Sequence, residues 1–120
     1  MHRLDRDTSG CLVLGRTRES AAALARAFKE GIIKKSYIAL VSPCPSGPCQ
    51  GTIDAPLYKR RGVPGEPDRI IAISEERGGR PAVTQYQIVA SSMNSGFSYA
   101  LLKLVPVSGR THQVFLPLTP

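Results

Sequence analysis

The sequence contains no tryptophan, few other aromatic residues and no long apolar run. Only 6% of its 120 residues are aromatic, and its apolar runs fall far short of the ~20 residues that a membrane span needs. We therefore expect a soluble protein. A chain of this length can form one domain at most, with a modest hydrophobic core, and no composition shift or repeat suggests a domain boundary.

Cysteine is also scarce, and the three cysteines do not form a recognisable set. Cys11, Cys44 and Cys49 are odd in number and no signal peptide is visible, so neither a disulfide framework nor secretion is expected. Cys44 and Cys49 have no nearby His or second Cys pair to complete a tetrahedral metal site. The sequence predicts loop cysteines, no bound metal and a reducing intracellular compartment, either the cytoplasm or an organelle.

Acidic residues are few relative to basic ones. Sixteen Lys and Arg oppose nine Asp and Glu, which gives a formal net charge of +7. Eleven of the sixteen are Arg, whose planar guanidinium suits phosphate. This balance favours a polyanionic partner, nucleic acid first. Charge alone leaves open a basic domain that has no such partner.

One helix pattern is present among the remaining segments. Apolar residues in the segment 18–31 recur at the i, i+3, i+4, i+7 spacing of a helix, with Thr17 or Ser20 as the N-cap and Gly31 as the stop. The residues at this spacing are Ala21, Leu24, Ala25 and Phe28.

Strand patterns are more numerous than helix patterns. Residues 11–17 predict a buried strand closed by Gly15, and the last two strands form a hairpin joined by residues 92–96. Pro117 and Pro120 end any helix that begins near residue 108. The pattern predicts an α+β domain with a mixed, mostly antiparallel sheet and few helices. The other predicted strands are 34–42, 51–58, 69–74, 82–91 and 97–107.

The first ten residues carry the strongest candidate for chemistry. Asp5 and Asp7 alternate with Arg3 and Arg6, and a Thr-Ser-Gly turn follows. A carboxylate can act as a nucleophile or proton acceptor when its position is fixed and a cation lies nearby. Taken alone, these residues favour the alternative, an ion-paired turn that leads into a strand. His2 alone is expected to be a hydrogen-bonding loop residue.

Four stretches occur in a characteristic order: HRLDRDTSG, KKSYIALV, GGRPAVTQYQIV and SGRTHQV. Together they cover nearly the whole chain, which resembles the RluA-type RNA pseudouridine synthases. The resemblance implies an isomerase that converts specific uridines in RNA to pseudouridine. It further implies RNA as the partner, whether ribosomal, transfer or messenger, with no cofactor, no metal and a monomeric enzyme.

The resemblance also assigns roles to individual residues. Asp5 matches the essential aspartate, which attacks or deprotonates the ribose of the target uridine so that the base can detach, turn and rejoin through carbon. Tyr37 matches the tyrosine that stacks on the uracil and assists proton removal at C5; by itself it would be a core-edge strand residue. Arg3 matches the arginine that fills the space left by the flipped uridine, and Arg110 is the second expected substrate-binding residue.

The chain departs from the family pattern in its last motif. Phe115 stands where the family carries a basic residue that pairs with the catalytic aspartate, and Pro117 stands where a histidine is expected. The chain also begins one residue before HRLD and ends seven residues after GRTHQ. We therefore expect the middle part of a catalytic domain, incomplete at both ends and inactive as it stands. The alternative is a non-catalytic RNA-binding fragment.

Overall fold

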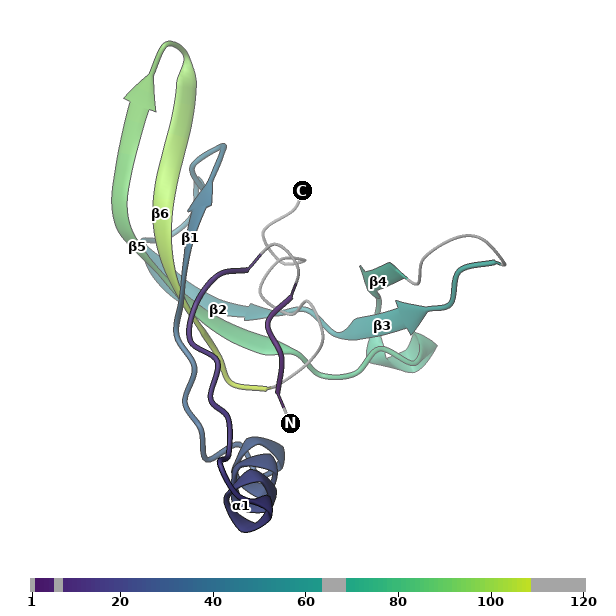
Figure 1. Cartoon of the computed structure of the whole chain (residues 1–120). Helices are drawn as coiled ribbons and strands as arrows, with labels where there is room; N and C mark the ends of the chain where they lie inside the picture. Colours follow the sequence, from purple (N-terminus) through teal and green to yellow (C-terminus); the bar gives the residue numbers. More distant parts are fainter. Residues whose placement is uncertain (1, 6–7, 64–68, 109–120) are drawn as a thin grey trace. The chain divides into compact units, whose positions relative to one another are not determined.

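The computed structural model describes residues 2–5, 8–63 and 69–108. The chain divides into two compact units, Met1–Lys34 and Lys35–Pro120. The described part of the first unit holds the helix α1, and that of the second holds six strands and a short 3-10 helix (Figure 1). No helix in the described ranges is both long and apolar enough to cross a membrane.

Helix α1 spans Arg18–Lys29 and begins with a reciprocal cap. The Ser20 N–H donates to the Thr17 hydroxyl oxygen (3.2 Å), and the Thr17 N–H donates to Ser20 Oγ (3.0 Å). Two N–H groups that the helix itself cannot satisfy are thereby paired. At the same end, hydrogen bonds from its own backbone and from Thr17 lower the pKa of the exposed Glu19 carboxyl. The predicted helix start is confirmed.

The end and the inner face of α1 also follow the predicted pattern. Gly31 has φ of +72°, a left-handed conformation that stops a helix and that glycine adopts without strain. The residues on the predicted apolar face are half-buried, whereas most of the helix is exposed. They are Ala21, Leu24, Ala25 and Phe28.

The predicted buried strand at 11–17 is wrong. Residues 11–15 form no strand, and the Leu12, Val13 and Leu14 side chains are 50%, 46% and 60% exposed. A strand requires a neighbour for its backbone hydrogen bonds, and the described sheets give this segment none. The Val13 N–H instead donates to the imidazole of His2. An apolar run predicts burial but cannot reveal whether a pairing partner lies beside it.

The second unit contains a four-stranded sheet in the order β1-β6-β5-β2. Each neighbouring pair is antiparallel. The predicted fold class, a mostly antiparallel sheet with few helices, is confirmed. The strands are β1 (Tyr37–Val41), β2 (Gln50–Asp54), β5 (Val83–Asn94) and β6 (Phe97–Pro106).

Strands β5 and β6 form a long hairpin with a two-residue turn (Figure 1). Ser95 and Gly96 both have positive φ, 50° and 82°. Two such residues define the type I′ turn, whose twist matches that of the paired strands. The connection is therefore shorter than the predicted 92–96, because the strands continue to Asn94 and Phe97. A bulge between Ile88 and Ala90 shifts the register.

A second, two-stranded antiparallel sheet contains β3 (Leu57–Arg60) and β4 (Arg69–Ala72), followed by the 3-10 helix η1 (Glu75–Arg77). The predicted strand 51–58 is thus two strands, β2 and β3. Pro56 lies in the break, where its missing N–H prevents it from donating to a strand ladder.

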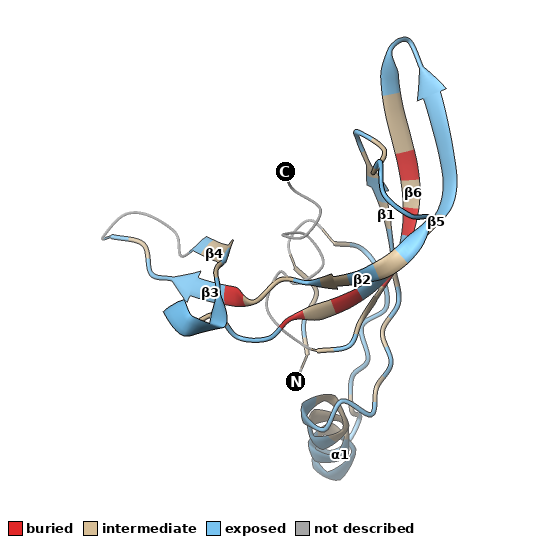
Figure 2. Ribbon diagram, turned by 180° about the vertical axis from the view of Figure 1, so that it is seen from behind, coloured by how far each residue is buried: buried red, intermediate tan, exposed pale blue. Residues whose placement is uncertain are grey.

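A cluster of buried apolar residues lies along β6 (Figure 2), on one face of the four-stranded sheet because alternate residues of a strand share a face. Leu57 and Ala82 are the other buried apolar residues in the described ranges. Ala100, Leu102 and Leu104 are 1%, 0% and 0% exposed. Half-buried side chains from β1, β5 and the β1–β2 loop pack against them. Residues at odd positions of β6 face the other side, where the neighbouring β1 residues Ile38 and Leu40 are 62% and 71% exposed.

These two faces predict different responses to the same substitution. Leu104→Ala should lower the free energy of unfolding by about 2–5 kcal/mol, because it leaves a cavity in a fully buried position. Leu40→Ala, in the same sheet, should lower it by less than about 1 kcal/mol, because that side chain already contacts solvent. Urea unfolding followed by circular dichroism measures both. Equal losses would show that the two faces are buried alike.

Candidate active site

Asp5 lies near the start of the first unit, outside any helix or strand. It is half-buried, and its backbone carbonyl accepts a hydrogen bond from the Thr8 N–H (3.0 Å). Gly10 has φ of +145°, which favours glycine at this position. Gly10 lies in a bend, and the turn over Thr-Ser-Gly stays a prediction. Thr8 Oγ1 is buried with no hydrogen-bond partner in the described part of the chain.

His2 closes the loop that carries Asp5. Its ring stacks on Phe28 of α1, with ring centroids 4.2 Å apart and an interplanar angle of 22°. The Val13 N–H donates to His2 Nε2 at 2.9 Å, and the same nitrogen lies 3.2 Å from the Val13 carbonyl oxygen. The predicted role of His2 as a hydrogen-bonding loop residue is confirmed. The segment between His2 and Val13, which includes Asp5 and the exposed Arg3, is therefore fixed at both ends.

Gly15 lets this segment pack closely against α1. A methyl group at Gly15 would lie 2.6 Å from Ala21 Cα and 2.8 Å from the Ser20 carbonyl carbon. Real side chains do not approach backbone atoms so closely, so the helix or the segment would have to move. Gly15 lines the same small hollow as His2 and Phe28, and any shift would reach the Asp5 loop through them.

Gly15→Ala should therefore lower the free energy of unfolding by about 1–3 kcal/mol, the usual cost of overpacking. Urea unfolding measures this loss. Hydrogen exchange at the Val13 amide should also become faster, because the bond to His2 weakens. Ser9→Ala, at an exposed position, serves as the control and should leave both values unchanged. Normal stability of Gly15→Ala would show that the segment is not held tightly on α1.

Tyr37 lies in the second unit, as the first residue of β1. It pairs with Leu104 of β6, which in turn pairs with Tyr86 of β5. Directly paired residues share a face of a sheet, so the two tyrosines flank a fully buried leucine. Both are half-buried and pack against the core. Tyr37 is thus fixed by the sheet in the manner of a core-edge residue.

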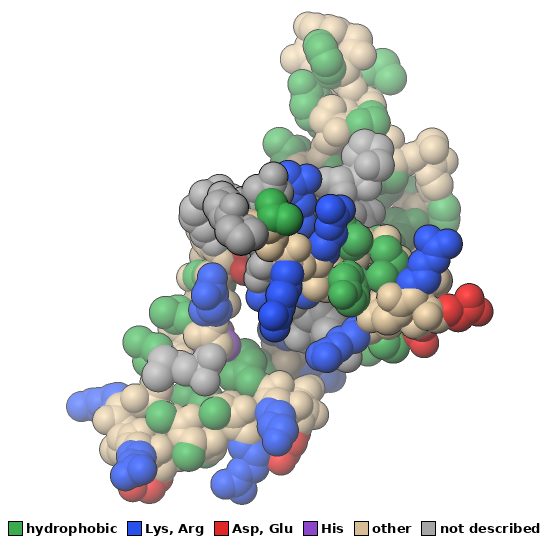
Figure 3. All heavy atoms as spheres, turned by 90° about the vertical axis from the view of Figure 1, so that its right-hand side faces the viewer, with side chains coloured by type: hydrophobic (Ala, Val, Ile, Leu, Met, Phe, Trp, Pro, Cys, Tyr) green, Lys and Arg blue, Asp and Glu red, His purple; other side chains and the backbone are tan. Residues whose placement is uncertain are grey.

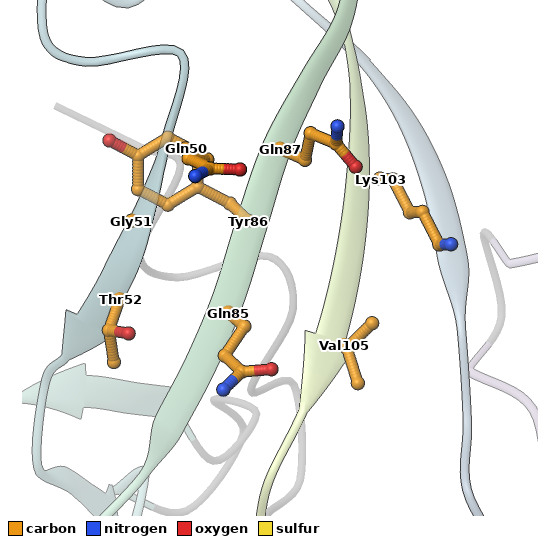
Figure 4. Close-up of a pocket in the computed structure, with 8 residues that line it drawn as sticks. All are labelled: Gln50, Gly51, Thr52, Gln85, Tyr86, Gln87, Lys103 and Val105. Atoms are coloured by element: carbon orange, nitrogen blue, oxygen red, sulfur yellow. The ribbon is translucent and has the colours of Figure 1, made fainter.

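Tyr86 is a residue whose position sequence reasoning missed. Its hydroxyl donates to the Pro48 carbonyl (3.1 Å), and its ring lies over Gly51 on the neighbouring strand β2 (Figure 4). A methyl group at Gly51 would lie 2.9 Å from Tyr86 Cε1. The ring therefore occupies the place of the missing side chain and fixes the β1–β2 loop. The sequence signal for this contact was Gly51, because a glycine in a strand often marks a place where another group approaches the backbone closely.

A shallow hollow of about 440 Å³ lies beside this tyrosine (Figure 4). Gln87 of β5 and Lys103 of β6 are paired across the strands, and Gln85 lies on the same face. Their side chains offer amide donors and acceptors and one ammonium group. The hollow suits a polar or anionic group. Its other lining residues are Gln50, Gly51, Thr52, Tyr86 and Val105.

The predicted site residues are thus distributed over both units. Arg3 and Asp5 share the clamped loop of the first unit, and Tyr37 belongs to the sheet of the second. Arg110 and Phe115 lie outside the described residues. Cys11, Cys44 and Cys49 are free, the last two in the β1–β2 loop as predicted. Across residues 2–5, 8–63 and 69–108, no three His, Cys, Asp or Glu side chains gather as metal ligands would.

A comparison of the sequence with models of known protein families identifies the family of this chain. The model of a family described as RNA pseudouridylate synthase matches residues 1–114, which include the Asp5 loop, Tyr37 and the SGRTHQ motif. This chain belongs to the RNA pseudouridylate synthase family. The family predicted from the four ordered motifs is confirmed.

Curated members of the family are similar along nearly the whole chain. Ribosomal large subunit pseudouridine synthase C of Pasteurella multocida is 38% identical over 115 residues, which are 95% of this chain and 32% of that protein. An uncharacterized RNA pseudouridine synthase of Zymomonas mobilis is 43% identical over 114 residues, covering 95% of this chain and 48% of that protein. The chain thus spans a third to a half of these relatives.

Solved structures of the family share the fold. Human RNA pseudouridylate synthase domain containing 1 superimposes with a TM-score of 0.79 at 26% identity, covering 94% of this chain and 46% of that one. Human RNA pseudouridylate synthase domain containing 4 gives a TM-score of 0.72 at 31% identity, covering 94% and 43%. The antiparallel sheet and helix described above therefore form part of a pseudouridine synthase domain.

Proposed function

We propose that this chain takes part in the conversion of uridine in RNA to pseudouridine, with Asp5 as the catalytic carboxylate. One observation carries the proposal. Asp5 stands in the HRLD motif, within the span that matches the family model, on a loop that His2 clamps to Val13 and α1. A fixed position is what a nucleophilic or proton-abstracting carboxylate requires.

The reaction divides into steps that the site residues can serve. The bond between N1 of the base and C1′ of the ribose breaks, the base turns, and C5 bonds to C1′. C5 then loses its proton, and N1 gains one. Asp5 attacks or deprotonates the ribose in the first step. Tyr37 presents a flat ring to the uracil and a hydroxyl for proton transfer at C5. Product and substrate are isomers, so no cofactor or metal is needed to supply atoms or electrons.

RNA is the proposed substrate and partner. The target base must leave its stack before the ribose can be reached, and the exposed Arg3 is suited to occupy the vacated space because guanidinium stacks on bases. Arg110 of the SGRTHQ motif is the second proposed substrate-binding residue. A monomeric enzyme is proposed, as the family resemblance implies. The net charge of +7 supports a polyanionic substrate.

A second candidate function is RNA binding without catalysis. Phe115 favours it, because an apolar ring stands where the family resemblance places the basic partner of Asp5. The basic surface is independent of that residue. A chain with this sequence can therefore bind RNA while the chemical step is slow or absent.

One pair of measurements tests both functions. RNA carrying tritium at C5 of its uridines releases the label to water when C5 bonds to the ribose, and fluorescence anisotropy measures RNA affinity separately. Release of the label supports the synthase. Binding without release supports the second candidate. If neither binding nor release occurs, with the chain shown to be folded by circular dichroism, both proposals are wrong.

A further inference from the structure

The β3–β4 sheet has a basic face that the proposed reaction does not use. Tyr58 pairs with Ile71, and Arg60 pairs with Arg69. Paired residues share a face, and so do residues two apart along a strand. These four side chains, which we name the hairpin face, therefore lie on the same side of the sheet. Figure 3, which views the molecule from the side of β3 and β4, shows Lys and Arg side chains gathered around apolar ones.

The Arg60–Arg69 pair is costly in the absence of an anion. Like charges directly opposite each other destabilise a strand pair, with Cβ atoms roughly 4.5–5.5 Å apart. Both arginines are exposed, and neither guanidinium forms a hydrogen bond or ion pair with another described residue. A two-stranded sheet has little stability to spare. A phosphate between the two guanidinium groups would convert this repulsion into two charge-assisted contacts.

Tyr58 adds an aromatic surface to the same face. Its side chain is 41% exposed. A methyl group at Gly78 would lie 3.8 Å from Tyr58 Cδ2 and Cε2, so one part of the ring borders the Gly78 backbone and another part contacts solvent. A partly supported, exposed ring beside two arginines is the combination on which single-stranded nucleic acid stacks.

Backbone hydrogen bonds hold one end of the β3–β4 sheet in place. Leu57, the first residue of β3, is 4% exposed and pairs with Arg80 through two backbone hydrogen bonds of 2.9 and 2.8 Å. The Ile73 N–H donates to the Pro56 carbonyl (3.0 Å). These contacts fix the sheet where it joins the rest of the second unit. The other basic residues of this region are Lys59, Arg61, Arg77 and Arg80, opposed in η1 by Glu75 and Glu76.

We propose that the hairpin face binds a stretch of the RNA that does not include the reacting uridine, with Arg60 and Arg69 on one phosphate and Tyr58 stacked on an adjacent base. The inference rests on the proposed function for the identity of the ligand. RNA is favoured over an acidic protein because the aromatic ring suits a base. The contact adds affinity and leaves the chemical step unchanged.

The test is the affinity of the full chain for a fluorescent single-stranded RNA, measured by anisotropy from low to moderate salt. Arg60→Gln/Arg69→Gln should weaken binding by about tenfold or more. It should also make the slope of log K against log salt shallower by roughly 0.7, the value for one phosphate that is no longer neutralised. The control, Arg18→Gln/Arg26→Gln on α1, removes the same charge elsewhere and should change affinity much less.

Substitutions at Tyr58 separate stacking from charge. Tyr58→Leu should weaken binding roughly five- to hundredfold with an unchanged salt slope, because it removes the stacking surface and no charge. Tyr58→Phe keeps the ring and should bind normally. Circular dichroism verifies that each variant is folded.

The outcomes distinguish this inference from the proposed function. If the hairpin variants and the helix control weaken RNA binding equally, the inference is wrong. The proposed synthase function would not be affected by that result. Normal binding by Tyr58→Leu would show that no base stacks there and would also overturn the inference. Tighter binding of a polyglutamate peptide than of RNA would assign the face to an acidic protein. Absence of RNA binding by the unmodified chain would refute the proposed function as well.

Discussion

Replacing Asp5 by asparagine is expected to reduce the release of tritium from C5-labelled RNA by roughly three or more powers of ten. The amide preserves the shape of the side chain but can neither attack the ribose nor accept its proton. The affinity for RNA should change by less than about threefold, because the amide keeps the size of the side chain and the bond that closes the loop joins His2 to Val13. Anisotropy with the same RNA measures this second value.

Two aspartates provide matched controls for Asp5. Asp7→Asn changes the same motif, and Asp54→Asn changes an exposed residue at the end of β2. Both should retain most of the activity. If the unmodified chain turns over too slowly to measure, the three substitutions are compared in the Phe115→Arg background. Equal activity of the Asp5 variant and the controls would remove Asp5 from the mechanism.

Phe115→Arg is expected to produce the largest gain in rate. The family resemblance places a basic residue at this position, paired with the catalytic aspartate. Removing one member of an ion pair in a desolvated site costs about 3–5 kcal/mol, which corresponds to roughly two to four powers of ten in rate. Restoring the cation should therefore raise tritium release by a factor in that range, while the affinity for RNA changes much less.

The charge must be separated from the change of side-chain size. Phe115→Met keeps an apolar side chain without the ring and should give no gain. Phe115→Arg in a chain that already carries Asp5→Asn should also give no gain in rate, because the carboxylate that the arginine would pair with has been removed. Turnover by the unmodified chain at the rate of the Phe115→Arg variant would show that no basic residue is needed there. It would also remove the support for a non-catalytic RNA-binding role.

Local patterns in the sequence were sufficient where the interactions are local. The cap at Thr17 and Ser20 and the stop at Gly31 involve atoms a few residues apart, so α1 could be placed from sequence alone. The β5–β6 hairpin is nearly as local, and only its turn was misjudged. Asp5 was selected through its motif, and its catalytic role stays a prediction.

Contacts between distant residues could not be predicted in this way. The bond from the Val13 N–H to His2 spans 11 positions, and it takes a backbone group that a strand would have used. The contact between the Tyr86 ring and Gly51 joins residues that are farther apart in the sequence. The pairing of Arg60 with Arg69 depends on the register of β3 and β4. A shift of one residue would move these side chains to opposite faces.

The sequence by itself determined the family, the candidate catalytic residues, the positive charge and the helix. Those features depend on residue identity and on short-range spacing, both of which are written directly in the chain. The tertiary structure alone decided that Leu104 is buried and Leu40 exposed, that His2 closes the Asp5 loop, and that Tyr58 shares a face with two arginines. Each of these depends on which strand or segment lies beside another, and that arrangement arises only when the chain folds.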